Sequence, residues 1–405
     1  MALRRTAAAV LAVVIATGSG CAARSPSRSA ARRPPPRPDP TTTVPPTSTS
    51  LVPSATPTTV PAPVQPPPGW TSALTSLPPG GGFTSLSCIS NTFCVAAGGG
   101  TDDTGTQTTT GAGVTVSWDG ASWSEPSVYF PAPATGAVTA PVLPSISCTM
   151  GPSCTIVDGS DHFSSGDGTN WSPASPMTAA IGPPANPADP GPGHAGSRSM
   201  AVSCPTAGFC AVVDNTGHTY VRRNGGWLAP EAFGQPATGG VALYQAGHVG
   251  IACLNGSFCT AVVGASILDW DGTTWSEAPS TWTSTPPPGP AAIACPTTHL
   301  CAVVAGPSLW LRNGGQGWTP GGTIDPGGVL DSISCPTSSF CLAVDTAGRA
   351  LSWNGTSWTP PRQVVPQAVQ YPDPGTSVSC PTPSFCMVMN GDGDYATYAA
   401  PGTPG

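Results

Sequence analysis

Residues 332–358 read SISCPTSSFCLAVDTAGRALSWNGTSW and contain every element of a unit that recurs seven times along the chain. Its two cysteines are separated by five residues, and fourteen of the fifteen cysteines share this Cys-x5-Cys spacing. Successive first cysteines lie 40 to 60 residues apart, a period typical of supersecondary units that bury their apolar faces only against one another. The pairs are Cys88 with Cys94, Cys148 with Cys154, Cys204 with Cys210, Cys253 with Cys259, Cys295 with Cys301, Cys335 with Cys341, and Cys380 with Cys386.

Turn signals divide this sixth unit into four short strands. The turns are residues 336–339, 346–348 and 354–357, which are rich in Pro, Gly, Asn, Ser and Thr. A four-stranded antiparallel meander repeated seven times predicts an all-β fold, a seven-bladed β-propeller of four-stranded antiparallel blades. The predicted strands of the sixth unit are residues 332–335, 340–345, 349–353 and 358–359.

The apolar pattern around each cysteine pair assigns the two inner strands. An aliphatic residue stands two positions before every first cysteine, as Ile333 does before Cys335, and it alternates with a small Ser or Ala. This alternation indicates an innermost strand with one face in the core. Six of the seven second cysteines follow a large apolar residue such as Phe340, which we expect between neighbouring blades. The continuous apolar run after the second cysteine, as in residues 211–213, indicates a second strand buried on both faces.

The outermost strand of the seventh unit is missing from the C-terminal end of the repeat array. Six units end on a tryptophan after a short turn, whereas the seventh stops after Tyr398 without one. Residues 68–72, Pro-Gly-Trp-Thr-Ser, match those tryptophan endings and precede the first cysteine strand. We therefore predict that this N-terminal strand completes the last blade and closes the ring, which removes an open sheet edge.

Each cysteine pair flanks a tight turn, and we expect seven local disulfides that join the first two strands of each blade. The competing interpretation is metal binding, but Cys-x5-Cys differs from the Cys-x2-4-Cys spacing of zinc sites. The five histidines are scattered and none recurs beside the pairs. The sequence therefore predicts no metal and no cofactor.

The N-terminus predicts export. Arg4 and Arg5 precede an apolar run that is too short to cross a bilayer, so residues 1–20 are interpreted as a signal peptide. Cys21 is the only cysteine outside the pairs and stands where bacterial lipoproteins are acylated. The segment resembles a lipobox but departs from it at Gly18, where lipoboxes usually carry Leu, Val or Ile. The predicted location is extracytoplasmic on a lipid anchor, with simple secretion as the alternative.

The domain boundaries follow from composition. Residues 21–67 contain the lipidated cysteine and a Pro/Ser/Thr-rich linker predicted to be disordered, with either a wall-spanning role or none beyond linking. The propeller is predicted over residues 68–400, and residues 401–405 form a disordered tail. We expect a monomer.

The propeller region is acidic. It carries six arginines, no lysine and nineteen acidic residues, a net charge of −13. Nucleic acid and anionic lipid surfaces are poor partners for such a surface, so the only membrane contact we expect is through the lipid anchor. The paired cysteines indicate an oxidising compartment. The absence of lysine beside abundant Ala, Gly and Pro is typical of high-GC actinobacteria.

The third turn of several units resembles the Asp-box of sialidase-like propellers. Residues 117–123, 269–275 and 352–358 carry an Asp or Asn, a glycine and a tryptophan, but lack the residue between acid and glycine. In that family the box is a structural hairpin, so the resemblance implies a fold. A sialidase-like site would also need three arginines around a substrate carboxylate, and Arg222, Arg312 and Arg349 fall in predicted third strands, away from the channel.

Length variation is confined to one face of the predicted ring. The cysteine turns are uniform in length, whereas other connections are long and rich in Gly and Pro. These long segments join the second strand to the third in unit one and join consecutive units from one to four. Loops on a rigid scaffold commonly carry recognition, although growth of loops without function is an alternative. The ligand-binding residues we predict on this face are Tyr129, Phe130, His194, Arg198, Tyr244 and His248.

The sequence favours a cell-envelope binding or scaffold module whose ligand is a glycan, a peptide or a protein. No catalytic residue is predicted. The alternatives are a sialidase-like glycoside hydrolase and a purely structural wall protein without a specific ligand.

Overall fold

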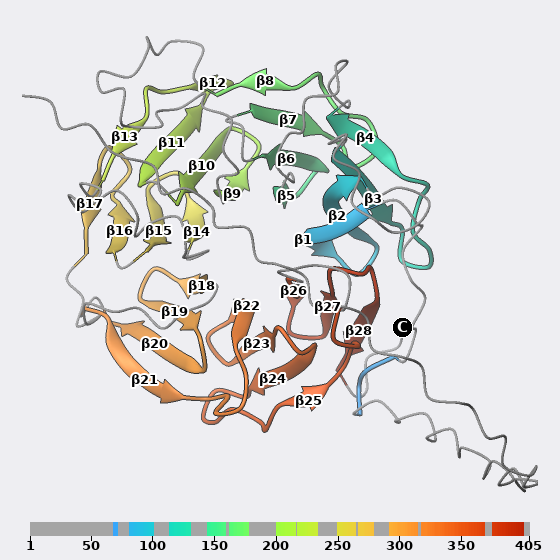
Figure 1. Cartoon of the computed structure of the whole chain (residues 1–405). Helices are drawn as coiled ribbons and strands as arrows, with labels where there is room; N and C mark the ends of the chain where they lie inside the picture. The colour runs from blue at the N-terminus through green and yellow to red at the C-terminus, as the bar shows by residue number, and fades with distance from the viewer. Residues whose placement is uncertain are drawn as a thin grey trace, which may run out of the picture. The chain divides into compact units, whose positions relative to one another are not determined.

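Each cysteine pair marks the inner hairpin of one blade in a computed structural model of the chain. The structure contains seven antiparallel sheets arranged in a ring, which confirms the predicted seven-bladed β-propeller (Figure 1). The chain divides into two units, Met1–Ala62 and Pro63–Gly405, and all described residues belong to the second. They are residues 68–71, 81–100, 113–130, 144–158, 162–177, 200–215, 217–233, 249–264, 266–278, 291–314, 317–368 and 375–400.

The first and second strands of each blade form the wall around the centre of the ring. The innermost strands are β1 (Gly81–Ser90), β5 (Ser145–Thr149), β9 (Met200–Thr206), β14 (Val249–Asn255), β18 (Ala291–Thr297), β22 (Leu330–Thr337) and β26 (Ser377–Thr382). The second strands are β2 (Phe93–Gly100), β6 (Ser153–Val157), β10 (Phe209–Asp214), β15 (Phe258–Val263), β19 (Leu300–Ala305), β23 (Phe340–Asp345) and β27 (Phe385–Met389).

The third and fourth strands lie toward the rim. The third strands are β3 (Gly113–Trp118), β7 (His162–Gly166), β11 (His218–Arg223), β16 (Ser266–Trp270), β20 (Ser308–Asn313), β24 (Arg349–Trp353) and β28 (Tyr395–Ala399). The outer strands are β4 (Ser127–Phe130), β8 (Ser175–Pro176), β12 (Gly226–Trp227) with β13 (Glu231–Ala232), β17 (Trp275–Glu277), β21 (Thr319–Thr323) and β25 (Arg362–Gln363). Among the described residues, no helix is long and apolar enough to cross a membrane.

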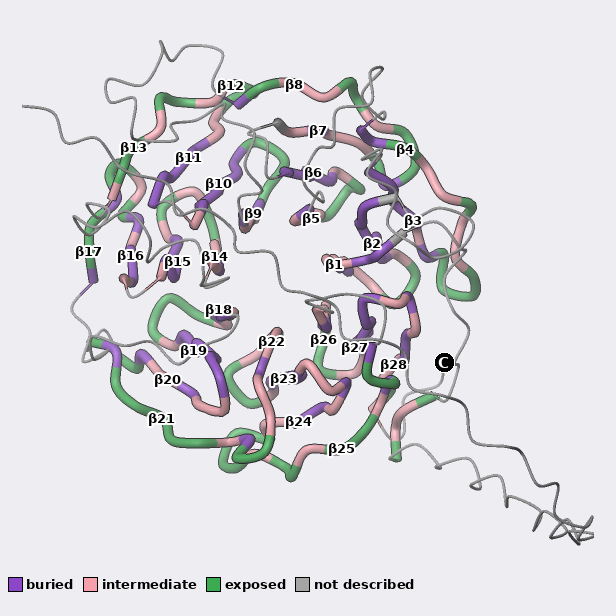
Figure 2. Tube along the Cα trace, viewed as in Figure 1, coloured by how far each residue is buried: buried purple, intermediate pink, exposed green. Residues whose placement is uncertain are grey.

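Burial falls from the second strand to the rim. Every residue of β10 is buried, whereas every residue of β21 is exposed (Figure 2). The second strand is covered on both faces by adjacent blades, which explains its continuous run of Val and Ala and confirms that prediction. The inner strands alternate: Ile333 is buried and Ser334 is half-buried.

The outer strand of the sixth blade differs from the prediction. Residues 358–359 form no strand there, because Trp358 makes only an isolated bridge with Trp353 and the strand proper is β25. Pro360 and Pro361 lie between the two pairings. Since proline has no N–H to donate, these two residues interrupt the ladder and split the outer strand in two.

Within the described ranges, the hydrophobic core consists of seven separate clusters, one at each contact between neighbouring blades. At the contact of blades five and six, for example, Val304 and Leu309 pack with Leu330 and Leu351. Phe340 packs in the cluster between blades six and seven, as predicted for the residue before the second cysteine. A single blade cannot cover its own faces, so the ring is stabilised only as a whole.

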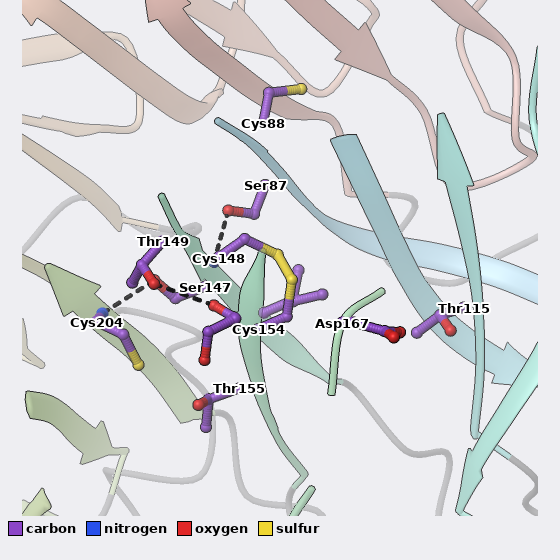
Figure 3. Close-up of a disulfide and its surroundings, with 12 residues drawn as sticks. Ser87, Cys88, Thr115, Ser147, Cys148, Thr149, Cys154, Thr155, Asp167 and Cys204 are labelled. Carbon is purple, nitrogen blue, oxygen red and sulfur yellow. Dashed lines mark hydrogen bonds between the residues drawn. A yellow bond between two sulfur atoms is a disulfide. The ribbon is translucent and has the colours of Figure 1, made fainter. Parts of the chain in front are cut away.

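A serine on the inner strand ties most blades to the next. The backbone N–H of Cys148 donates to the hydroxyl of Ser87 at 3.0 Å, and Cys204 donates to Ser147 at 2.9 Å (Figure 3). An innermost strand is a sheet edge with unpaired N–H groups, and the neighbouring blade supplies their acceptor. The same tie joins Cys253 to Ser203, Cys380 to Ser334 and Cys88 to Ser379.

Two neighbouring interfaces lack this tie. Ala252 of blade four and Ala294 of blade five stand at the positions of the serines, immediately before Cys253 and Cys295. An alanine methyl group cannot accept a hydrogen bond. We call the contacts of blade four with five and of blade five with six the alanine interfaces, and the other five the serine interfaces.

The ring closes through the N-terminal segment, as predicted. Trp70 forms an antiparallel bridge with Tyr398 on the outer edge of β28. The N–H of Ala399 donates to Gly69 at 2.7 Å, and that of Thr71 donates to Thr397 at 2.9 Å. The aromatic rings of Trp70 and Tyr398 lie 5.5 Å apart and pack in the cluster between blades six and seven.

All seven predicted disulfides are present. They join the first and second strands of each blade across positions that face each other, with Cα atoms 3.9 to 4.1 Å apart. Seven intrachain disulfides indicate an oxidising environment outside the cytoplasm. In chain order, the bonds link Cys88 to Cys94, Cys148 to Cys154, Cys204 to Cys210, Cys253 to Cys259, Cys295 to Cys301, Cys335 to Cys341, and Cys380 to Cys386.

Candidate functional site

The propeller has two chemically different faces. On one, which we call the turn face, the cysteine turns lie beside the turns that precede the outer tryptophans: the indole of Trp270 donates to Gly256 of its cysteine turn at 3.0 Å. The other, which we call the loop face, carries the turns between second and third strands and the connections from blade to blade. The N–H of Thr346 in such a turn donates to Val329 of such a connection at 2.9 Å.

The hairpins of the turn face satisfy hydrogen-bonding groups of their own backbone. Both Asp167 and Asp271 accept two backbone N–H groups of their own turn with one carboxylate oxygen, at 2.7 to 2.9 Å. These hydrogen bonds lower the pKa of Asp167 and of Asp271 to about 2. Gly168 and Gly272 follow with φ of 96° and 101°, the left-handed region that glycine reaches without strain. In blade six, Asn354 accepts the equivalent pair at 2.9 Å. The acid-glycine motif is therefore a turn cap.

Two of the predicted ligand-binding residues, Tyr129 and Phe130, are described and both are buried. They are 2% and 9% exposed and pack in the cluster between blades one and two. The absence of a side chain at Gly113 leaves room for the Tyr129 ring, and its hydroxyl donates to Gly98 at 3.4 Å. Burial raises the pKa of Tyr129 well above its ordinary value. These two side chains are therefore part of the core at this interface.

The other predicted site residues lie outside the described residues. They are His194, Arg198, Tyr244, His248 and the predicted lipidation site Cys21.

A buried polar residue marks the loop-face end of four second strands. It stands four positions after the second cysteine and is Asp158, Asp214, Asp345 or Asn390. In three of the four, its side-chain oxygen accepts the backbone N–H four residues later, at 2.8 to 2.9 Å. The residue therefore closes the turn to the third strand. Residues 390–394 belong to this group and form such a turn.

Sequence reasoning missed this position, although its signal was available. The spacing Cys-x3-Asp or Cys-x3-Asn recurs in four units. Asp345 was predicted only as the last residue of the strand 340–345, and no role was predicted for its carboxylate, which like that of Asp214 has no exposed surface.

The densest charged group on the described part of the loop face consists of Asp325, Asp345 and Arg349. The Arg349 Nε donates to an Asp345 oxygen at 2.6 Å, and its Nη2 donates to Asp325 at 3.2 Å. Both carboxylates are fully buried, whereas the arginine side chain is 25% exposed. Burial and the adjacent Asp345 carboxyl raise the pKa of Asp325, against the opposing charge of Arg349.

A second buried carboxylate group occupies the same position in blade three. The Asp214 oxygens accept the Tyr220 hydroxyl at 3.3 Å and the His218 backbone N–H at 2.9 Å. The His218 Nδ1 lies 3.5 Å from the same carboxylate. The stretches of chain that the structure describes hold no group of three His, Cys, Asp or Glu side chains arranged to bind a metal ion.

The arginines relevant to a sialidase-like site are each engaged by a neighbouring group. Arg222, Arg312 and Arg349 lie on β11, β20 and β24, which are third strands. Arg222 lies over the ring of Phe163 at 5.4 Å, and Arg312 pairs with Asp269 at 2.6 Å. These three guanidinium groups serve packing and ion pairs between strands, so they form no triad around a channel ligand.

Comparison with known proteins shows the fold alone. No protein-family model and no curated protein matches the chain. The matching solved structures include YCF48 bound to D1 peptide, at 14% identity over 82% of this chain and 97% of that one, with a TM-score of 0.54. The WD40 β-propeller domain of Doa1 matches at 10% identity over 83% and 98%, with a TM-score of 0.52. Virginiamycin B lyase from Staphylococcus aureus matches at 9% over 78% and 94%, with a TM-score of 0.51. These neighbours include a peptide-bound protein and a lyase, so the likeness identifies a seven-bladed propeller without an activity.

Proposed function

We propose that this protein is an exported binding or scaffold module of the cell envelope, and that its loop face holds a protein or peptide partner. The observation that carries this proposal is the contrast between the two faces. All seven cysteine turns have the same length and a disulfide. The connections between blades differ widely: β8 ends at Pro176 and β9 begins at Met200, whereas β25 ends at Gln363 and β26 begins at Ser377.

A propeller suits this role because its blades hold the loops in fixed positions. The second strands are buried along most of their length, and serine hydrogen bonds fix neighbouring blades against each other at five interfaces. Little ordering of the scaffold would therefore accompany binding. YCF48, a neighbour in fold, is known with a bound peptide, which makes a peptide the first ligand class to test. The excess of carboxylates favours a partner that is neutral or basic. The lipid anchor at Cys21 and the linker up to residue 67 belong to the same proposal, since together they would hold the propeller at a membrane.

The test is a binding screen with the mature chain, produced in an oxidising compartment. Arrays of envelope peptides and glycans are probed, and released sugar is measured in the same wells. We expect saturable binding of a peptide without released product. Replacing residues 178–199 with a short turn should weaken this binding at least tenfold.

A matched change on the other face provides the control. Replacing Ser338 and Ser339 of a cysteine turn with alanine should leave binding unchanged. Release of sugar would replace the proposal with the glycoside hydrolase alternative. Equal loss of binding from both faces, or saturable binding to glycans alone, would contradict a peptide site on the loop face.

A further inference from the structure

The connection between blades five and six is fastened to both blades. Of the blade-to-blade connections, residues 324–329 are the one that lies wholly within the described ranges. The N–H of Asp325 donates to Pro307 of blade five at 3.2 Å, and Thr346 of blade six donates to Val329 at 2.9 Å. Leu330 at the start of β22 donates to Gly306 at 2.7 Å. The connection thus bridges an alanine interface on the loop face.

Side-chain charges add a second fastening. Asp325 comes from this connection, while Asp345 and Arg349 come from the two ends of a turn in blade six. Arg349 meets both carboxylates, at 2.6 Å for Asp345 and 3.2 Å for Asp325. The backbone at Gly328 covers the group so closely that a Cβ atom there would overlap the oxygens of Asp325 and Asp345 and the Nη2 of Arg349.

The group contains one cation for two carboxyl groups, and no other charged residue faces it among the described residues. The strand β21 and the turn at Gly306-Pro307 carry no charged side chain. Arg362 of β25 is exposed, and Asp331 of β22 accepts the N–H of Thr376 in blade seven. With both carboxyl groups ionised, the buried group has a net negative charge, which is costly without solvent. With one proton, the group is neutral and the two carboxyl groups share a hydrogen bond.

We propose that Asp325, Asp345 and Arg349 form a proton-dependent latch that holds the connection of residues 324–329 onto blade six when protonated and releases it as the pH rises. The latch depends on no ligand, so it stands apart from the binding function proposed above. Its release would change the shape of the loop face over blades five and six.

The direction of the effect follows from linkage. The folded-state pKa of Asp325 is raised above the ordinary value of 3.8, mainly by burial. A group with a raised folded-state pKa contributes its full stabilisation below the unfolded pKa and loses it as the pH rises through the folded-state pKa. The closed connection is therefore favoured by acid, and each unit of elevation corresponds to a tenfold change in its opening equilibrium.

Hydrogen exchange of the full mature chain, followed by mass spectrometry from pH 4 to pH 8, tests the latch. The readout is the protection of a peptide covering residues 324–330 after correction for intrinsic exchange. Protection in the wild type should fall tenfold or more across this range. The Asp325→Asn and Asp345→Asn variants each leave one carboxylate with one cation, so protection should stay high and independent of pH in both.

The control variant is Asp331→Asn, which removes an acid of the same region that faces blade seven. It should retain the wild-type dependence. Wild-type protection that does not change with pH would overturn the latch. So would a dependence that survives in a folded Asp325→Asn or Asp345→Asn variant. Because both substitutions remove the same imbalance, one variant that folds is sufficient for the test.

Discussion

The five serine interfaces and the two alanine interfaces join blades of the same design through different chemistry. At a serine interface, a neutral hydroxyl accepts a backbone N–H, as Ser87 does from Cys148 at 3.0 Å. At the first alanine interface, Arg312 of blade five forms an ion pair with Asp269 of blade four at 2.6 Å. At the second, Arg349 pairs with Asp325 at 3.2 Å. In the sector from blade four to blade six, ion pairs therefore take the place of the serine hydrogen bonds.

The comparison shows that a contact between blades can lack the serine hydrogen bond while the propeller remains closed. The apolar clusters are present at all seven interfaces. They supply the non-directional part of the stability, and either kind of polar tie can then fix the position of one blade against the next. Ionic ties respond to pH and partner loss more strongly than neutral ones, so the two sectors should respond differently to the same perturbation.

Breaking the ion pair of the first alanine interface should give the largest effect. In the Asp269→Ala variant, the 9% exposed side chain of Arg312 loses its carboxylate. We expect a loss of about 3 kcal/mol in the free energy of unfolding, because a buried charge is left uncompensated. Urea denaturation under non-reducing conditions measures it. A loss below about 1 kcal/mol would show that the rings of Phe258 and Trp318 hold the guanidinium without its partner.

Removing a serine tie should cost less. The Ser147→Ala variant leaves the N–H of Cys204 without its 2.9 Å acceptor. We expect a loss of about 1 to 2 kcal/mol, the cost of one unsatisfied buried donor. The matched comparison is Ser338→Ala, which removes a hydroxyl from a cysteine turn and should be neutral. Equal effects from the two variants would contradict a special role for the inner-strand serine.

Installing a tie at an alanine interface should raise stability slightly. In blade six, Ser334 accepts the N–H of Cys380 at 3.0 Å. The Ala294→Ser variant places a hydroxyl at the equivalent position of blade five, where it can accept the N–H of Cys335. We expect a gain of about 0.5 to 1 kcal/mol, measured as a higher midpoint of thermal unfolding. A lower midpoint would mean that blades five and six are packed too closely for the added oxygen.

The smallest effect should come from the turn caps, with a pH dependence opposite to that of the latch. Hydrogen bonds hold the pKa of Asp271 at about 2, below its ordinary value of 3.8. The cap therefore stabilises fully above the ordinary value and loses this contribution as the pH falls through 2. The Asp271→Asn variant should unfold with a weaker dependence on acid, since the amide oxygen can cap the turn as Asn354 does. Its acid midpoint is followed by tryptophan fluorescence, and an unchanged midpoint would remove Asp271 from the acid response.

The ring could be predicted from the sequence because its determinants are local and repeated. The cysteine spacing located seven inner hairpins, and the Trp-Thr at residues 70–71 located the closing strand. These features depend on turns and on period-two alternation, which one unit already contains.

The contacts between repeats could not be predicted in the same way. The partner of Ser87 lies 61 residues away in the next blade, and Asp325 meets an arginine from a different turn. Spacing within a unit carries no information about such pairs. Tyr129 was predicted as a ligand-binding residue because it stands next to a long loop, whereas Gly113 on the adjacent strand β3 makes room for its ring in the core.

The closing segment determines how the ring carries mechanical load. The described part of the chain begins at Pro68, and Gly69, Trp70 and Thr71 lie on the outer edge of the seventh blade. A pull on the N-terminal chain is therefore transmitted first to the bridge at Trp70 and to its two neighbouring backbone hydrogen bonds. Peeling of this short strand would release the seventh blade's outer edge before any disulfide is stretched, because each disulfide lies inside a single hairpin.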